Sequence, residues 1–187
     1  MSRATTRLAD FNNAWYAPGA SVPKRALWML AEQLFLATPF PWPSSVRGAV
    51  LRLFGARVGQ GVVIKPRVRV KYPWNLSIGD HSWIGEGVWI DSLAQVTIGA
   101  NACLSQDCMV ETGNHDWRKP TFDLMVKEVV IEDGAWAAVR SLLLPGSRLA
   151  THAVLSGGSV LAGQSEPYAI YVGNPAVKVK DRKVDAP

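Results

Sequence analysis

Cysteine is scarce in this chain of 187 residues, which contains only Cys103 and Cys108. The two cysteines lie five positions apart, and Cys108 falls at a position that the repeat described below is expected to bury. Disulfides persist mainly in oxidising compartments, and the sequence points to a reducing one. We therefore expect two reduced thiols, and the sequence gives no support to a covalent acyl-cysteine intermediate.

Long hydrophobic runs are also missing. The helix-like segment 26–38 has 13 residues and is interrupted by Glu32 and Gln33, whereas a membrane-spanning helix needs about 20 apolar residues. Residues 1–13 are polar and lack the apolar core of a signal peptide. Because 48% of the residues are apolar, the chain can bury one core. We expect a soluble, cytoplasmic protein with no nucleic acid among its partners.

A strict period of six runs through the second half of the chain. Aliphatic residues recur at Ile131, Ala137, Leu143, Leu149, Leu155 and Leu161, and a small residue usually follows each of them four places later. A strand has a side-chain period of two and a helix has one of 3.6, so neither explains this spacing. One short strand followed by a sharp corner does explain it.

The same period extends back to Val58, and three hexads complete one triangular coil. Successive coils then begin at Val58, Ile78, Ile98, Ile131 and Leu149. The sequence therefore predicts an all-β fold over residues 58–187, a parallel β-helix of about five coils. Residues 116–130 are expected to leave the third coil as a long loop, and residues 166–187 are expected to form a tail.

Residues 1–57 are predicted to form a helical cap. Segment 26–38 reads as one helix and segment 46–54 as a second, shorter amphipathic helix. Such helices would cover the open end of the β-helix, where strand edges are otherwise exposed. A functional alternative remains open, because Arg67 and Arg69 point outward from the adjoining strand. This end could rest on the inner face of an anionic membrane or meet a lipid-linked sugar.

The three histidines differ in their place in the repeat. A regular solenoid has uniform walls, so chemistry is expected where the repeat breaks. His115 occupies the last in-register position before the loop, and we expect it to face outward from the wall there. His81 and His152 have no loop beside them, and their coils are about 14 Å apart at the spacing of parallel strands. They cannot share a metal ion with bonds of about 2 Å, so no metal site is predicted.

Several segments carry a resemblance to a known family. ETGNHDWRKPTFDL, VVIEDGAWAAVRSLLLPGSRLATHAVLSGGSVL and IYVGNPAVKV are similar to the hexapeptide-repeat O-acetyltransferases, which include the galactoside and maltose acetyltransferases. RALWMLAEQLF, VLRLFGARVGQGV and PWNLSIGDHSWIGEGV resemble more narrowly the colanic-acid-biosynthesis type. The resemblance implies a left-handed β-helix, a homotrimer, and acetyl-CoA as a co-substrate with no metal requirement.

In that family the histidine that matches His115 is the general base. A sugar hydroxyl is a poor nucleophile at neutral pH, and a neutral imidazole that accepts its proton typically contributes ~10²–10⁴-fold to the rate. The resemblance also implies that Asp91, at a corner of the second coil, holds a hydroxyl of the acceptor, with Asn114 and Trp117 on either side of the base. Trp83 and Trp89 could supply further flat faces for a sugar ring.

The resemblance also indicates where acetyl-CoA would bind, in a groove between subunits. Trp136 would border this groove, and Gly157, Gly158 and Ser159 would supply close backbone approach and polar contacts to the cofactor. Where relatives commonly have an arginine after the GNPA motif, this chain has Val177. Contacts to the CoA phosphates are therefore expected from Lys178 and Lys180.

The sequence thus predicts an acetyl-CoA-dependent O-acetyltransferase that acts on a free, nucleotide-linked or lipid-linked saccharide in exopolysaccharide or other surface-glycan biosynthesis. N-acetylation of an amino sugar is a variant of the same class, because the same base would serve either acceptor. An alternative from another class is a non-catalytic trimeric scaffold or glycan-binding module that retains the fold.

Overall fold

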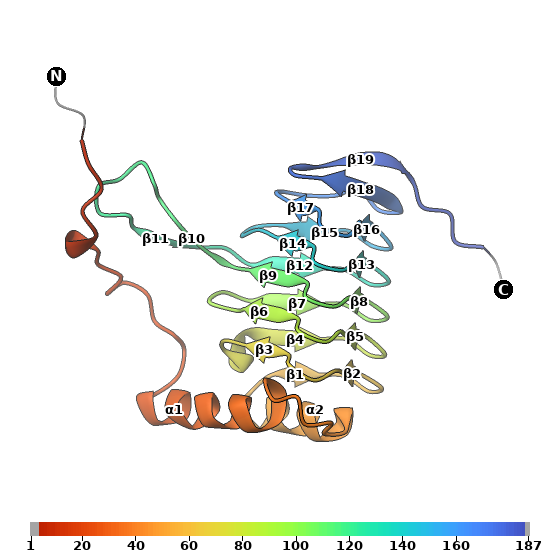
Figure 1. Ribbon diagram of the computed structural model, residues 1–187, viewed down its shortest axis with the longest axis horizontal. Coiled ribbons are helices and arrows are strands. Elements are labelled where there is room, and N and C mark those ends of the chain that lie inside the picture. The colour runs from red at the N-terminus through yellow and green to blue at the C-terminus, as the bar shows by residue number, and fades with distance from the viewer. Residues whose placement is uncertain (1–3, 186–187) are drawn as a thin grey trace.

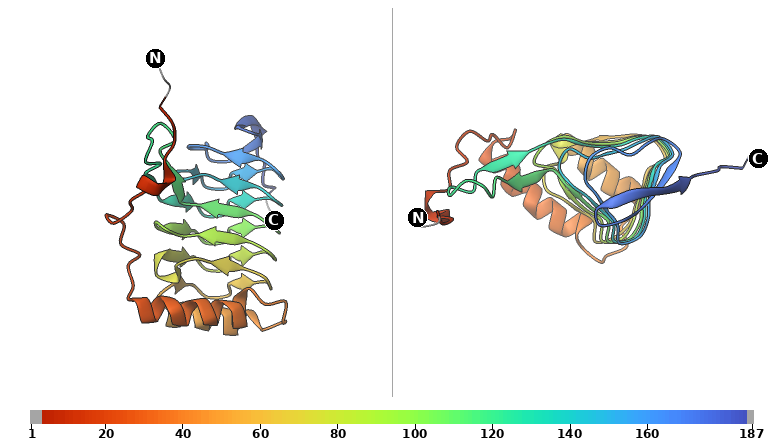
Figure 2. Two further views of the ribbon diagram at one scale, coloured as in Figure 1. Left: turned by 60° about the vertical axis from the view of Figure 1, so that its left-hand side comes forward. Right: turned by 90° about the horizontal axis from the view of Figure 1, so that it is seen from above.

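The computed structural model describes residues 4–185, and from residue 57 onward the chain winds into a triangular prism (Figure 1). Each coil contributes one short strand to each of three faces, and strands stacked on one face pair in parallel. From above, successive coils superpose as a triangle (Figure 2). The predicted fold class is confirmed: a hexapeptide-repeat parallel β-helix with a helical cap and a protruding loop after the third coil.

Every strand of the prism is short, because six residues must supply both a strand and a corner. The first face contains β1 (Arg57–Val58), β4 (Leu76–Ile78), β7 (Val96–Ile98), β12 (Val129–Ile131) and β15 (Arg148–Leu149). The second contains β2 (Val63–Ile64), β5 (Trp83–Ile84), β8 (Cys103–Leu104), β13 (Trp136–Ala137) and β16 (Val154–Leu155). The third contains β3 (Arg69–Val70), β6 (Trp89–Asp91), β9 (Met109–Glu111), β14 (Leu142–Leu143) and β17 (Val160–Leu161).

The aliphatic columns predicted from the period are the columns of the core. Ile78 pairs with Val58 on one side and with Ile98 on the other, and Ile98 pairs with Ile131. The stacking therefore continues across the long insertion between the third and fourth coils. Cys108 is fully buried, as expected from its place in the repeat, and burial raises the pKa of its thiol to about 12.

The backbone conformation at one corner of the prism accounts for the presence of two of the three histidines. The residue three places after each first-face aliphatic adopts a left-handed backbone, with φ between 53° and 65°, at Gly61, His81, Asn101, Gly134 and His152. Glycine, asparagine and histidine tolerate this conformation better than most residues. His81 and His152 are therefore corner residues of separate coils. Within residues 4–185, no cluster of three His, Cys, Asp or Glu side chains could hold a metal ion.

The helical cap lies across the first coil (Figure 1). It consists of α1 (Val22–Ala31), which continues as the π-helical turn η2 (Glu32–Leu36), and of α2 (Ser44–Leu53). The first helix begins four residues before the predicted Ala26, because Pro23 is tolerated in a first helical turn. None of the helices within the described range combines the length and apolar character needed to cross a bilayer.

Each strand edge that the first coil would expose is bonded to a cap side chain. On the first face, Arg52 donates to the carbonyl of Val58 at 2.9 Å. On the second face, the Ser44 hydroxyl exchanges two bonds with the backbone of Ile64. On the third face, Trp28 Nε1 donates to the Val70 carbonyl at 2.9 Å, and Glu32 accepts from the Val70 amide at 2.7 Å. The cap thus satisfies backbone groups that an open edge leaves unpaired.

The insertion after the third coil forms an antiparallel arm. β10 (Gly113–His115) pairs with β11 (Leu124–Val126), and His115 lies opposite Leu124. The excursion therefore begins at Gly113, three residues before the predicted boundary of 116, and β12 has rejoined the first face by Val129. The expected position of His115 on the prism wall was wrong: it lies on the arm, because the chain turns into the hairpin before this residue.

The two ends of the chain complete the fold. The N-terminal segment, with the short helix η1 (Leu8–Asp10), runs beside the arm, where the Arg7 amide donates to the Pro120 carbonyl at 2.7 Å. A further short helix, η3 (Pro73–Asn75), lies between the first two coils. After β17 a sixth, partial turn leads into the hairpin of β18 (Ala169–Gly173) and β19 (Ala176–Asp181), which covers the end opposite the cap (Figure 1).

Candidate active site

His115 is held on the arm with one ring nitrogen engaged. Its Nδ1 lies 2.8 Å from the carbonyl oxygen of Phe122. Because a carbonyl can only accept, this contact places the proton of a neutral imidazole on Nδ1, so that Nε2 carries the lone pair. The ring also stacks on Phe122, with centroids 4.3 Å apart, and contacts Phe11 at 5.6 Å. The imidazole is thus fixed in the tautomer that a general base requires.

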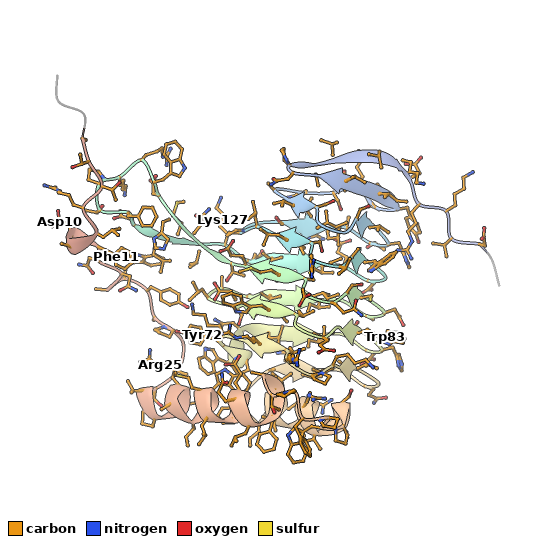
Figure 3. The ribbon with its side chains drawn as sticks, in the orientation of Figure 1. Asp10, Phe11, Arg25, Tyr72, Trp83 and Lys127 are labelled. Atoms are coloured by element: carbon orange, nitrogen blue, oxygen red, sulfur yellow. The ribbon has the colours of Figure 1, made fainter. Side chains whose placement is uncertain are left out.

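A cavity of about 550 Å³ opens beside His115. It lies between the N-terminal segment, the arm and the side of the coils, and Figure 3 shows Phe11, Tyr72 and Arg25 along this gap. Its polar lining includes Tyr16, Tyr72, Arg25 and Lys71. A broader, open hollow of about 770 Å³ lies elsewhere, around the first-face corner near Gly79, and it does not contain the candidate base.

The charges around the cavity are unevenly paired. Lys71 forms an ion pair with the buried carboxylate of Asp91, with Nζ and Oδ1 3.1 Å apart. Arg25 Nε is buried and has no hydrogen-bond partner among the residues described. The Tyr16 hydroxyl donates to the Leu93 carbonyl at 2.7 Å. Burial, followed by the proximity of Tyr72 and Asp91, raises the pKa of Tyr16 to about 12. The guanidinium of Arg25 and the hydroxyl-bearing rings of Tyr16 and Tyr72 therefore line the space beside His115.

The residues predicted to bind the acceptor are only partly gathered around this cavity. Asp91 does not line the cavity itself but forms the ion pair with Lys71, which does. Asn114 is exposed, and its side-chain oxygen accepts a hydrogen bond from the His115 amide. Trp117 is 76% exposed on the arm and does not line the cavity of His115. A contact between Trp117 and the same acceptor is therefore not supported within one chain. Trp89 packs its ring against the Arg69 guanidinium at 4.7 Å.

The residues predicted to bind acetyl-CoA lie on or next to the second face. Trp136 is half-exposed, and its Nε1 donates to Ser105 Oγ at 2.9 Å, beside a cleft of about 270 Å³ lined by Trp83 and Cys103. Gly157 and Gly158 are exposed at the corner that follows β16. The predicted polar contact from Ser159 does not fit, because its side chain is buried and its hydroxyl accepts from the Gly173 amide.

The two C-terminal lysines differ in their surroundings. Lys178 lies 2.8 Å from Glu166 and 2.9 Å from Asp181, and these carboxylates raise the pKa of its ammonium group. Lys180 is exposed on β19. Of the two, Lys180 is the more available for an anion such as a CoA phosphate, since Lys178 already has two acidic partners.

The histidine and the predicted cofactor residues lie on different sides of one chain. The arm leaves the prism between the third and first faces, whereas Trp136 belongs to the second face (Figure 2). Trp83, on the second face, likewise lies across the prism from Phe11 and Tyr72 (Figure 3). Within residues 4–185, the residues predicted to bind the acceptor and those predicted to bind acetyl-CoA are therefore not gathered at one place.

Comparison with known proteins decides the family. WcaF of Escherichia coli, named for an acetyltransferase role in colanic acid biosynthesis, is 34% identical over 168 residues, which are 88% of this chain and 90% of WcaF. The chain belongs to the hexapeptide-repeat acetyltransferases. No protein-family model matches the chain.

Two solved structures of hexapeptide-repeat acetyltransferases or their relatives share this fold. The acetyltransferase VCA0836 of Vibrio cholerae, solved with acetyl coenzyme A, superposes with a TM-score of 0.76 at 25% identity, covering 89% of this chain and 92% of that one. A maltose O-acetyltransferase of Clostridium difficile gives a TM-score of 0.78 at 22% identity and covers 87% and 88%. The predicted resemblance is confirmed, and the chain is an acetyltransferase.

Several residues around His115 escaped sequence reasoning. Phe11 and Tyr16 meet the histidine or its cavity, although no motif or period marks them. Phe122 lies within the segment ETGNHDWRKPTFDL, but nothing in that segment indicates its contact with His115. Lys71 follows Lys65, Arg67 and Arg69 at alternate positions of the sequence, so its charge was visible, but its pairing with Asp91 was not. Arg25 preceded the predicted helix and faces the cavity because that helix begins earlier, at Val22.

Proposed function

We propose that this acetyltransferase transfers the acetyl group of acetyl-CoA to a hydroxyl of a saccharide in exopolysaccharide or surface-glycan biosynthesis, with His115 as the general base. The observation that carries the proposal is the contact between His115 Nδ1 and the Phe122 carbonyl, which leaves Nε2 free beside the cavity. The relationship to WcaF supports the pathway class, and the acetyl-CoA complex of the Vibrio protein supports the donor.

The reaction requires no covalent enzyme intermediate. The acceptor oxygen attacks the thioester carbon while its proton passes to Nε2 of His115, a transfer that typically contributes ~10²–10⁴-fold to the rate. The tetrahedral intermediate then collapses as the carbon–sulfur bond breaks. Nε2 returns the proton to the departing thiolate, which leaves as CoA thiol. The bond from Nδ1 to Phe122 keeps the imidazole oriented through both transfers.

The acceptor is expected to carry a negative charge near the reacting hydroxyl. Arg25 has an unpartnered, buried Nε at the cavity, and a guanidinium binds carboxylate or phosphate through charge-assisted hydrogen bonds. Lys71 is already paired with Asp91, so Arg25 is the available cation. A uronic acid and a sugar phosphate both meet this requirement, and a neutral hexose does not.

A homotrimer would complete the site. His115 and Trp136 lie on different sides of one chain, so the arm of one subunit could meet the second face of its neighbour (Figure 2). Co-expression of His115→Ala chains with Trp136→Ala chains tests this arrangement. Random trimers should regain roughly one quarter of the wild-type sites if each site joins two subunits. No recovery at all would contradict a shared site.

The proposed chemistry is tested by thiol release from acetyl-CoA with a panel of hexoses, uronic acids, amino sugars and sugar phosphates. His115→Asn should lower kcat by about two orders of magnitude or more while CoA binding persists. His81→Asn is the matched control, because asparagine suits the left-handed corner at that position. Equal turnover by wild type and His115→Asn would refute the assignment of the base. Failure of the wild type to bind CoA would favour a scaffold or glycan-binding module.

A further inference from the structure

The helical cap has an outward face that is apolar and uncovered. Its large side chains are each more than half exposed: Val22, Leu27, Met29, Leu30, Leu34, Phe40 and Leu53. The other outward positions of the first helix are Pro23, Ala26 and Gln33. No charged residue therefore interrupts this face between residues 22 and 34. We call these seven large side chains the basal apolar face.

This exposure is unusual because the same helix is also apolar on its inner side. Trp28 and Leu36 are buried against the first coil with 1% and 0% exposure. A surface helix normally places charged residues opposite its buried stripe, and a helix that is apolar all round is normally covered on both sides. A contiguous exposed apolar face marks an interaction site. The inner contacts already hold the helix to the prism, so the outer residues are not needed for that purpose.

The charge of the cap and the first coil is predominantly positive, although Arg67 of the first coil is paired with Glu86 of the second, with Nη1 and Oε1 3.5 Å apart. Residues 11–70 contain eight basic side chains and a single acidic one, a formal charge of +7. The basic residues are Lys24, Arg25, Arg47, Arg52, Arg57, Lys65, Arg67 and Arg69. The one acid, Glu32, is turned toward the first coil, where it accepts from the Val70 amide. Arg57, Lys65 and Arg69 are exposed on the first coil, next to the cap.

We propose that this end of the prism docks on a membrane that carries anionic lipids. The basal apolar face would enter the boundary between headgroups and acyl chains, and the cations of the first coil would meet lipid phosphates. Amphipathic surface helices bind bilayers in this way, by combining buried apolar area with attraction to anionic lipid. A second protein chain would not require the excess of positive charge, which is why the membrane is the occupant that the charges favour.

Docking would also place one end of the cavity of His115 near the membrane, although His115 itself lies on the arm, farther from the cap (Figure 3). Arg25 belongs to α1 and lines the cavity of His115, and Figure 3 shows it at the level of the helices. An acceptor anchored in the bilayer could therefore reach the cavity without leaving the surface. This consequence depends on the proposed function, whereas docking itself does not.

Co-sedimentation of the full chain with vesicles tests the docking. Vesicles of phosphatidylcholine with about one third phosphatidylglycerol should bind the protein at least about tenfold more tightly than phosphatidylcholine alone. Leu30→Glu and Leu34→Glu should each weaken binding by about tenfold or more, because each replaces buried apolar area with a charge. Raising the salt concentration should weaken binding as well.

Matched controls separate docking from folding and from catalysis. Val177→Glu introduces the same charge at a side chain that is 59% exposed on β19, at the other end of the prism, and it should bind vesicles like the wild type. Thiol release with a soluble acceptor should be unchanged in Leu30→Glu, so a loss of docking can be distinguished from a failure of the proposed chemistry.

Two results would overturn the proposal. The first is wild-type protein that does not bind anionic vesicles, or that binds them as well as Leu30→Glu and Leu34→Glu do. The second is a light-scattering measurement in which the wild-type assembly has twice the mass of the Leu30→Glu assembly. That outcome would assign the basal apolar face to a contact between copies of this chain.

Discussion

Replacing Arg47 with methionine is expected to lower the free energy of unfolding of the helical cap by about 3 kcal/mol. Arg47 is 2% exposed, and burial lowers the pKa of its guanidinium. Its nitrogens donate to the carbonyls of Phe35 at 3.2 Å, Phe40 at 2.7 Å and Ile64 at 3.3 Å, and to the carbonyl of Trp42. One buried cation thus joins α2 to the turn η2, to the loop between them and to the edge strand β2.

The magnitude follows from what methionine leaves behind. A hydrogen bond to a charged group contributes about 1.5–3 kcal/mol, and an unsatisfied buried acceptor is destabilising by a similar amount. Water can solvate the carbonyls of the loop after the substitution, and the Ile64 carbonyl keeps the Ser44 hydroxyl as a donor. Removal of a buried charge offsets part of the loss. The net expectation is therefore close to the value for one or two lost charged bonds, not four.

Hydrogen exchange of the Ile64 and Val70 amides is the most direct assay, because a solenoid can lose its terminal unit without global unfolding. Both amides donate hydrogen bonds to side chains of the cap, Ile64 to Ser44 and Val70 to Glu32, and these bonds protect them from exchange. Arg52→Met is the matched control, since Arg52 is exposed and bonds two carbonyls at the same edge, and it should change stability by less than about 1 kcal/mol. Equal exchange in Arg47→Met and wild type would refute the reasoning.

Three further outcomes follow from buried titratable groups. The pKa of Tyr16, raised to about 12 by burial, keeps the phenol protonated in any assay near neutral pH, so Tyr16→Phe should leave the alkaline limb of the kcat/KM profile in place; loss of that limb would contradict it. Cys108, with a pKa of about 12, should resist iodoacetamide until the protein unfolds, and mass spectrometry of labelled native protein would reveal any exception. Burial raises the pKa of Glu32 above its ordinary value of 4.5. Between the pKa of the unfolded chain and the higher pKa of the folded state, the folded state binds more protons, so stability should fall as the pH rises through that range. Glu32→Gln keeps an acceptor for Val70 and should flatten the fall in Tm, and an unaltered slope would argue against this cause.

The fold was predictable from sequence because the period of six encodes stacking directly. A residue six places on lies on the next face, and three hexads return the chain to the same column, so Val58, Ile78 and Ile98 had to pair. The period ends where the stacking ends. It therefore predicted where the arm and the cap lie in the sequence, but not which secondary structure they form. The helix start at Val22 was missed because the prediction did not include Ser21 and Pro23 as start signals, although they are typical of an N-cap and a first helical turn.

The composition of the site could not be predicted because its contacts join distant parts of the chain without a pattern. The Tyr16 hydroxyl bonds a carbonyl 77 residues away, and Phe11 meets a histidine more than 100 positions later. His115 was identified since it stands where the repeat breaks. Its place on the arm depends on the antiparallel pairing of β10 with β11, which no period specifies.

The first helix brings three requirements together, and these account for its composition. Trp28 on its inner side donates to the Val70 and Lys71 carbonyls of the first coil, and Arg25 on its flank faces the cavity of His115. Leu30 and Leu34 on the outer side remain exposed. A helix that only capped the prism would gain solubility from charged residues at those outer positions. Their absence is therefore better explained by contact with a surface than by folding, and it links the position of the cap to the place where the acceptor arrives.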